Sequence, residues 1–454
     1  MNSFRRSTFL GLCFIVLLTA VSLTSQVRSY LTLPTHQKLP VGERLSLDID
    51  FPSEILQRLS VYIKAESKNV LNLQNGDLRE QVLSFNKDWP VAMQPGKVNL
   101  QLKLFGIIPL RQVTVNVVPR VEVYPGGHSI GVMLQSQGVM VIGYSPVVGE
   151  NGNRHYPAKE AGVQIGDQII SINGVKVNRD ESAAQIIDKA GSSDLPINMV
   201  IERQGKEHQI SINPFYCQET DRYRIGLYIR DSAAGVGTLT FYDAKSQVYG
   251  ALGHLIMDTE TYQGIDLGHG NIVSAAIQGI QQGKRGQPGE KIGTFQAKGI
   301  NGDIKSNTTV GIFGELQDFP SNTWFTNPVP IAYVNEIEPG PANIYTVVDG
   351  NKVEKFAIEI ERIMPQKQLD GKGLIIRITD SKLLSITGGI IQGMSGSPIV
   401  QDGKLVGAVT HVFVNDPTRG YGVPVEWMIL KTSLIKSKAK ALDLSSAFIL
   451  FLIN

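Results

Sequence analysis

The chain has 454 residues, of which 42% are hydrophobic and 19% charged, which is enough for two or three packed domains and is not typical of a disordered protein. Its 43 basic and 41 acidic residues leave a formal charge of +2 without a long basic run, so the composition argues against nucleic-acid binding. The only cysteines, Cys13 and Cys217, exclude a disulfide framework. The histidines are scattered without zinc-like spacing, and we expect no metal and no cofactor.

Residues 1–30 have the pattern of an export segment. Arg5 and Arg6 precede an apolar run over residues 9–23, which is the order of a cytoplasmic positive region followed by a lipid-seeking helix. The run is long for a signal peptide and short for a full membrane span, and no clear cleavage site follows it. We therefore predict a retained anchor, with a cleaved signal peptide as the alternative and a buried globular helix as a weaker one.

Residues 31–120 indicate a small all-β domain. Polar and apolar residues alternate with period two over residues 44–49 and again over residues 97–104, as in strands with one buried face. The segment contains no group of residues that suggests chemistry. An interaction or spacer role is the simplest expectation.

Residues 121–215 form a second unit, in which strands over residues 129–134 and 138–144 precede a helix-to-hairpin passage at residues 157–174. This passage resembles the PDZ family, with an Ala-Gly helix end followed by Gly-Asp-Gln-Ile-Ile-Ser-Ile-Asn-Gly. Asn173-Gly174 is typical of a tight hairpin turn. A helix over residues 180–190 would line a groove to which an extended peptide adds as a strand.

The resemblance to PDZ domains implies a glycine-containing loop whose backbone N–H groups bind a terminal carboxylate. By this resemblance, the peptide-binding loop consists of Ser129, Ile130, Gly131 and Val132. It departs from the usual Gly-Leu-Gly-Phe pattern, so internal peptide segments or the protein's own chain are also expected as ligands. A PDZ fold without a working groove is the alternative.

Residues 216–430 contain a candidate catalytic nucleophile. In the turn at residues 393–398, Gly-Met-Ser-Gly-Ser-Pro, Ser395 precedes two predicted strands joined by a hairpin, the arrangement of chymotrypsin-like β-barrel peptidases. The flanking glycines would let the N–H groups of Gly393 and Ser395 form an oxyanion hole. A Gly-x-Ser-Gly string is common in ordinary turns, and Ser397, before Pro398, is a rival serine with a more structural position.

A serine nucleophile needs a base, and His254 is the first candidate. It follows a predicted strand over residues 235–241 and lies in a glycine-containing turn that could hold an imidazole rigid yet accessible. His411, among apolar residues of a predicted strand, is interpreted chiefly as a packed or site-shaping histidine. His269, between two glycines, is a weaker candidate.

The supporting acid is predicted to be Asp380, which ends an apolar strand fifteen residues before Ser395 and keeps the chain order His, Asp, Ser. Its separation from His254 is longer than in chymotrypsin-like enzymes. Asp243, Asp258 and Asp266 remain competitors. An N-cap for a helix beginning at residue 381 is almost equally consistent with the sequence.

The whole pattern resembles the stage IV sporulation protein B peptidase family of endospore-forming bacteria, through the anchor, the PDZ-like unit and the motifs around His254, Asp380 and Ser395, with Thr-His-Val-Phe-Val-Asn-Asp-Pro at residues 410–417. The resemblance implies secretion from the forespore into the intermembrane space. It also implies self-cleavage and cleavage of a membrane-bound regulator of an intramembrane protease, which releases processing of a sigma-factor precursor. The tail, residues 431–454, lies outside it.

Two alternatives stay open. The first is a non-catalytic PDZ scaffold whose barrel has lost its activity. The second is a general envelope quality-control protease of the HtrA group, although there the PDZ domain follows the catalytic domain, whereas here it precedes it. We expect protein or peptide substrates and no nucleic-acid partner.

Overall fold

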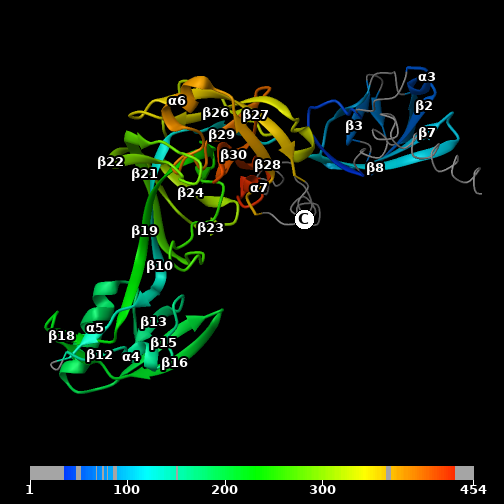
Figure 1. Cartoon of the computed structure of the whole chain (residues 1–454). Coiled ribbons are helices and arrows are strands. Elements are labelled where there is room, and N and C mark those ends of the chain that lie inside the picture. Colours follow the sequence, from blue (N-terminus) through cyan, green and yellow to red (C-terminus); the bar gives the residue numbers. More distant parts are fainter. Residues whose placement is uncertain are drawn as a thin grey trace, which may run out of the picture. The chain divides into compact units, whose positions relative to one another are not determined.

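The computed structural model describes residues 35–47, 53–67, 69–73, 76–78, 80–84, 89–149, 152–364 and 370–434 (Figure 1). The protein is mainly β, as predicted, and it divides into one compact unit that ends at Val121 and another from Glu122 to Leu434. The anchor predicted for residues 1–30 and all but the first few residues of the tail lie outside the described residues. Among the residues described, no helix is long and apolar enough to cross a membrane.

The first unit consists of two sheets with strand orders β1-β8-β7-β2-β5 and β4-β3-β6. Its elements are β1 (His36–Pro40), α3 (Ser53–Leu56), β2 (Leu59–Ala65), β3 (Leu71–Leu73), β4 (Gly76–Leu78), β5 (Glu80–Ser84), β6 (Val91–Ala92), β7 (Gly96–Leu104) and β8 (Ile108–Val118).

Strand β7 shows why this unit folds as it does. Its alternating sequence buries Val98, Leu100 and Leu102 in the core and leaves the intervening polar residues partly exposed, so the strand predicted over residues 97–104 is confirmed. The other predicted strand is not seen over its described part, residues 44–47, where Arg44 makes only an isolated bridge. Residues 48 and 49 lie outside the described residues.

The PDZ-like region lies in the second unit. Its elements are β10 (Ser129–Tyr144), β11 (Val147–Val148), β12 (Arg154–His155), α4 (Pro157–Glu160), β13 (Gln168–Ile172), β14 (Val175–Lys176), α5 (Asp180–Ser192), β15 (Ile197–Arg203), β16 (Lys206–Ile212), β17 (Phe215–Cys217), β18 (Arg222–Arg224) and β19 (Leu227–Tyr242). The predicted hairpin is confirmed, since Asn173 and Gly174 both have positive φ between β13 and β14. The predicted groove helix is confirmed as α5.

The long strands β10 and β19 run side by side from the PDZ-like region into the catalytic region (Figure 1). This arrangement corrects the predicted peptide-binding loop. Ser129, Ile130, Gly131 and Val132 lie within β10 and pair with β19, and all of them except Ser129 also pair with β21 (Leu267–Gln281) on the other side. Because both edges of this segment already have a neighbouring strand, it cannot accept a peptide as an added strand, and the assignment was wrong.

The catalytic region begins with strands that surround β10 and β19. These are β9 (Glu122–Pro125), β20 (Val248–Ala251), β21, β22 (Glu290–Asp303), β23 (Ser306–Thr308), β24 (Gly311–Asp318) and β25 (Val329–Pro330). A buried cluster that includes Ile130, Leu239 and Tyr249 fills the space between them.

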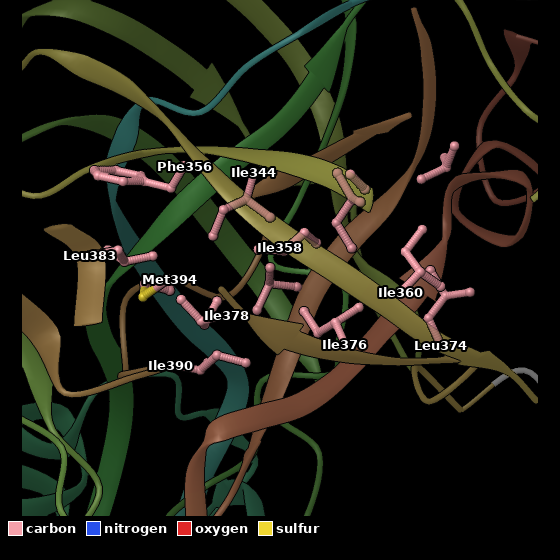
Figure 2. Packing of buried hydrophobic residues seen from close by; sticks show 14 of the residues in the cluster. Ile344, Phe356, Ile358, Ile360, Leu374, Ile376, Ile378, Leu383, Ile390 and Met394 are labelled. Carbon is pink, nitrogen blue, oxygen red and sulfur yellow. The ribbon is translucent and has the colours of Figure 1, made fainter. Parts of the chain in front are cut away.

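A closed barrel follows, with the strand order β26-β27-β28-β31-β30-β29, which confirms the predicted β-barrel. Its elements are η1 (Val334–Glu336), β26 (Gly340–Val347), β27 (Val353–Ile363), β28 (Leu374–Ile378), α6 (Ser381–Thr387), β29 (Pro398–Gln401), β30 (Lys404–Phe413), β31 (Asp416–Pro424) and α7 (Val425–Ile429). Figure 2 shows the barrel core, where Ile344, Ile358 and Ile376 of neighbouring strands belong to the same buried cluster as Met394 of the nucleophile turn. The turn that carries Ser395 is therefore anchored in the core.

Candidate active site

Ser395 lies in a turn that leads directly into β29. Gly393 and Gly396 have φ angles of 89° and 93°, a left-handed conformation that glycine adopts without strain. A Cβ on Gly396 would also lie 2.1 Å from the Thr238 carbonyl oxygen. The two glycines thus let the chain fold tightly around Ser395, whose side chain stays half-exposed between buried neighbours.

The backbone of this turn leaves two N–H groups available for a ligand. Within the described part of the chain, neither Gly393 N nor Ser395 N donates a hydrogen bond, whereas Met394 N, Gly396 N and Ser397 N all donate to carbonyl oxygens. Two unengaged amides beside a serine hydroxyl are what an oxyanion hole requires. The geometry is compatible with the predicted oxyanion role of Gly393 and Ser395.

Ser397 has the structural position that its place before proline suggested. Its side chain is fully buried, and its Oγ is 2.7 Å from the Met394 carbonyl oxygen and 3.0 Å from Thr346 Oγ1. A buried hydroxyl engaged on two sides is not available to attack a substrate. Ser395 is therefore the better placed serine of the two.

His254 follows β20 in a tight turn where Leu252 and Gly253 both have positive φ. An added Cβ on Gly253 would lie 2.8 Å from Thr410 Cγ2 and 2.9 Å from Val423 Cγ1 of the closed barrel. Only glycine permits this close approach, which brings the His254 turn against strand β30.

The ring of His254 is held in a defined tautomer. Its Nδ1 is 2.9 Å from the Leu255 carbonyl oxygen, and since a carbonyl can only accept, Nδ1 must donate and Nε2 must carry the lone pair. Burial lowers the pKa of His254 below its ordinary value, only partly offset by this hydrogen bond. A neutral imidazole with an unprotonated Nε2 is the form that a general base needs.

His411 lies beside His254, with 4.9 Å between the ring centroids. Its pKa is lowered to about 4 by burial and by repulsion from His254 and Lys372, which Asp370 partly opposes. Its Nδ1 is buried and has no hydrogen-bond partner among the described residues. Both rings are thus uncharged at neutral pH, which agrees with a site-shaping role for His411.

The hydroxyl of Ser395 does not point to either histidine in this structure. Its Oγ donates to the Thr410 carbonyl oxygen at 2.8 Å, one residue before His411 on β30. The fold therefore brings Ser395, His254 and His411 to one region around Thr410. A proton transfer from Ser395 to an imidazole requires the hydroxyl to leave this carbonyl, because it has a single hydrogen.

Asp380 occupies the N-cap of α6, so the alternative interpretation of this residue is confirmed. Its Oδ1 accepts from Leu383 N at 3.0 Å, and its Oδ2 accepts from Ala357 N at 3.3 Å. Within the described part of the chain it makes no hydrogen bond to a histidine, and in the structure the Leu255 carbonyl fixes the tautomer of His254. The role of Asp380 as supporting acid stays a prediction.

The remaining candidates are engaged elsewhere. Asp258 pairs with Arg230 at 2.7 Å, Asp243 accepts from Ser246, and His269 is exposed in β21 opposite Gln135. The backbone carbonyl of Asp266 accepts from Gln137 N. Asp370 and Lys372, whose charges act on His411, belong to no motif in the sequence, and only the fold brings them there.

Two comparisons identify this arrangement. Residues 221–429 match the SpoIVB peptidase S55 family, and residues 150–203 match a PDZ domain. Over residues 221–429, just under half of its length, the chain is thus similar to the SpoIVB peptidase S55 family. These two matches agree with the prediction of a serine endopeptidase.

Other known proteins resemble parts of this chain. The probable protease eep of Enterococcus faecalis is 36% identical over 70 residues, which are 15% of this chain and 16% of that relative, so the chain matches about a sixth of its length. Among solved structures, an inactive mutant form of Rv3671c from M. tuberculosis H37Rv has a TM-score of 0.25 and 10% identity, with 44% of this chain and 82% of that chain covered. The crystal structure of Deg5 has a TM-score of 0.25 and 14% identity, with 43% of this chain and 80% of that chain covered. The HtrA-type protease AlgW with a decapeptide has a TM-score of 0.26 and 12% identity, with 49% of this chain and 63% of that chain covered.

The protein has a second candidate site, a cavity of about 490 Å³ beside α5. The start of β19 forms one wall, and on its other side this part of β19 pairs with β10. The lining residues are Ile169, Asp180, Glu181, Ala184, Gln185, Ile187, Asp188, Arg222, Tyr223, Arg224, Ile225, Gly226, Leu227 and Ile229.

The cavity includes a glycine loop that the sequence analysis missed. Gly226 has a φ of 81°, and an added Cβ would lie 2.8 Å from the Ser145 carbonyl oxygen, so only glycine fits. Within the described residues, Ile225 N and Gly226 N donate no hydrogen bond, although the carbonyls of both accept one. The signal was present as Ile-Gly-Leu at residues 225–227, ahead of an apolar strand, but the earlier Ile-Gly-Val at residues 130–132 was chosen instead.

Among the residues that the structure describes, one acidic group has metal-like spacing, in which ligand atoms of Asp180, Glu181 and Asp231 lie within 4.8 Å of one another. The carboxylates are exposed or half-exposed, and clusters of this kind are common without an ion. It therefore provides no basis for a metal-dependent reaction.

Proposed function

We propose that this protein is a regulatory serine endopeptidase in which Ser395 is the nucleophile and His254 the general base. The observation that carries the proposal is the nucleophile turn itself. It presents a half-exposed hydroxyl, two unengaged amides at Gly393 and Ser395, and a neighbouring imidazole whose Nε2 bears the lone pair.

The proposed reaction follows from these groups. A bound substrate displaces the Ser395 hydroxyl from the Thr410 carbonyl, and the proton passes to Nε2 of His254 as Oγ attacks the scissile carbonyl carbon. The negative charge that develops on the substrate oxygen is stabilised by Gly393 N–H and Ser395 N–H. The imidazolium then returns its proton to the leaving amine, and water releases the acyl group by the same steps. Asp380 enters this proposal only through the family resemblance.

The groove beside α5 gives this peptidase a way to select protein segments. An extended peptide could pair with the open edge of β19 at Leu227 while its carboxylate or a backbone carbonyl meets Ile225 N–H and Gly226 N–H. The groove walls carry both Arg222 and Asp188, so a ligand with polar side chains is compatible. The ligand could be a substrate segment or part of this chain itself.

The physiological role that we propose is the one implied by the resemblance. The peptidase would be exported, stay associated with the membrane through residues 1–30, and act in the forespore intermembrane space of a spore-forming bacterium. There it would cleave itself and a membrane-bound regulator of an intramembrane protease, so that a sigma-factor precursor is processed. The positive and apolar N-terminal segment and the S55 family match support this role.

The test is self-cleavage of the full chain followed on gels, with fragments sequenced. The wild-type chain should produce fragments over time, and Ser395→Ala should produce none because no other serine can replace its hydroxyl. Ser385→Ala, a matched change on the exposed face of α6, should behave like the wild type. If Ser395→Ala cleaves itself as the wild type does, the non-catalytic scaffold with contaminating proteolysis becomes the better explanation.

A further inference from the structure

The two oxyanion amides belong to two peptide units of the nucleophile turn. Gly393 N–H shares a planar unit with the Gln392 carbonyl, and Ser395 N–H shares one with the Met394 carbonyl. In a trans peptide the C=O and N–H bonds point in opposite directions, so the group that holds the carbonyl also sets the direction of the amide. The contacts of Gln392 O and Met394 O therefore determine the oxyanion hole.

Lys291 of β22 is linked by hydrogen bonds to both carbonyls, directly to that of Gln392 and through two hydroxyl groups to that of Met394. The backbone N–H of Lys291 donates to Gln392 O at 3.0 Å. The aliphatic stem of the same side chain packs under the turn, since a Cβ added to Gly393 would lie 3.0 to 3.2 Å from its Cβ, Cγ and Cδ atoms. The first peptide unit is thus held by the backbone of Lys291 and covered by its stem.

The second peptide unit is held through a chain of hydrogen bonds that starts at the Lys291 amine. Nζ is 2.7 Å from Thr346 Oγ1, which is 3.0 Å from Ser397 Oγ, which is 2.7 Å from the Met394 carbonyl oxygen. Each hydroxyl has one hydrogen, and Nζ can only donate when charged. The arrangement that uses each hydroxyl hydrogen once runs from Nζ to Thr346 to Ser397 to Met394.

The chain is sealed from solvent. Lys291 is 4% exposed, and Thr346 and Ser397 are fully buried. Thr346 Oγ1 is the one hydrogen-bond partner of Nζ among the described residues, and burial lowers the pKa of Lys291 to about 7. Because a neutral amine also has N–H groups, Nζ can donate in either protonation state. Burying an amine at this position costs free energy, so we expect the amine to have a role there.

We propose that Lys291 is a positioning residue for the oxyanion hole, which orients Ser395 N–H through Thr346 and Ser397 and supports Gly393 through its stem. The proposal builds on the proposed function, because it assigns a supporting role to a residue that does not touch substrate. Lys291 lies on β22 and Thr346 on β26, so the device links the strands that surround β10 and β19 to the closed barrel.

The test measures hydrolysis of p-nitrophenyl butyrate by the full chain, with the rate of Ser395→Ala subtracted. Lys291→Met keeps the stem and removes the amine. We expect kcat to fall about 10-fold, less than the 10²- to 10³-fold loss for one whole oxyanion donor, because Ser397 N also donates to Met394 O. KM should change by less than about 2-fold, since the effect appears when the oxyanion forms.

Substitutions of Thr346 test the same hydrogen-bond chain independently. Thr346→Val removes the hydroxyl at constant shape and should match Lys291→Met, whereas Thr346→Ser should keep the wild-type kcat. The double variant Lys291→Met with Thr346→Val should be no slower than either single variant, because both break one chain. Lys298→Met, on the exposed part of β22, is the matched control and should leave kcat unchanged.

The result that overturns the proposal is a wild-type kcat in Lys291→Met, or losses that multiply in the double variant, or a change in KM alone. If Lys291→Met does not fold, the Thr346→Val and Thr346→Ser pair decides in the same way. Failure of the proposed function is distinguishable, because then the wild-type chain itself hydrolyses no more ester than Ser395→Ala.

Discussion

The nucleophile turn and the peptide groove of this peptidase are built in opposite ways. The turn at residues 393–398 is local, because its glycines, its serine and its two free amides all lie within six residues of sequence. The groove is assembled from α5 and from residues 222–229, which lie some distance apart in the chain and are joined directly by a hydrogen bond from Tyr223 N to Asp188 Oδ1. A local site can be found by its motif, whereas a site between elements depends on strand register.

The largest expected effect tests whether the turn has the correct base. His254→Gln should lower kcat/KM for p-nitrophenyl butyrate by about 10⁴-fold, because the lone pair of Nε2 is lost. His411→Gln should lower it by less than about 10-fold, since His411 has no hydrogen bond to Ser395. Equal losses in the two variants, or a larger loss at His411, would contradict the assignment.

The groove has its own matched pair of substitutions. Ala184→Phe on α5 fills the cavity beside β19 and should weaken binding of a fluorescein-labelled hexapeptide with a free carboxylate by about 10-fold, a loss of about 1.4 kcal/mol. Ser129→Ala changes the residue wrongly assigned to the binding loop, and its Oγ has no partner to lose. Fluorescence anisotropy should show no change for Ser129→Ala. A loss at Ser129 with none at Ala184 would restore the original assignment.

Asp380 separates a structural from a catalytic role. Asp380→Ala removes the helix cap and should lower the free energy of unfolding by about 1 kcal/mol, whereas Asp380→Ser retains an N-cap oxygen and should recover most of it. Urea denaturation measures both. Ester hydrolysis by the stable Asp380→Ser variant then shows whether the carboxylate itself is required, as the resemblance to the sporulation peptidases implies. Equal stability of the Ala and Ser variants would refute the cap.

The smallest expected effect is in the pH profile. Burial lowers the pKa of His254 below 6.5, and the base must be neutral to act, so the rate should persist below pH 6.5 and fall only on further acidification. His411, with a pKa of about 4, stays largely neutral above about pH 5 and adds little charge beside His254 there. The measurement is kcat/KM for the ester between pH 4 and pH 8. An acid limb centred at or above pH 6.5 is incompatible with the burial of this imidazole.

The same contrast explains how much the sequence alone could predict. The strand at residues 97–104, the hairpin at Asn173-Gly174, the helix α5 and the turn at Ser395 all follow from local periodicity or turn chemistry. The prediction of the carboxylate-binding loop was wrong because Gly131 and Gly226 lie in similar short motifs. Only the register of β10 between β19 and β21 shows that both strand edges at Gly131 are already paired.

The hydrogen-bond partners of the site residues also could not be predicted from the sequence. Lys291 gives no signal in β22, since its neighbours are those of an ordinary strand, and its importance comes from Thr346 and Ser397 of other elements. Asp380 shows the converse, a residue that a motif marks strongly but whose oxygens are bound to backbone amides in the structure. The role of Lys291 depends on side chains far apart in sequence, whereas that of Asp380 depends on backbone amides, one of them three residues away.

The central claim is that Ser395 is an activated nucleophile, and covalent labelling tests it most directly. The full chain is treated with a fluorophosphonate, digested, and analysed by mass spectrometry. We predict one modified serine, Ser395, in the wild type and no label in Ser395→Ala, with labelling strongly slowed in His254→Gln. Labelling at Ser397 or at another serine, or equal labelling in Ser395→Ala, would contradict the account.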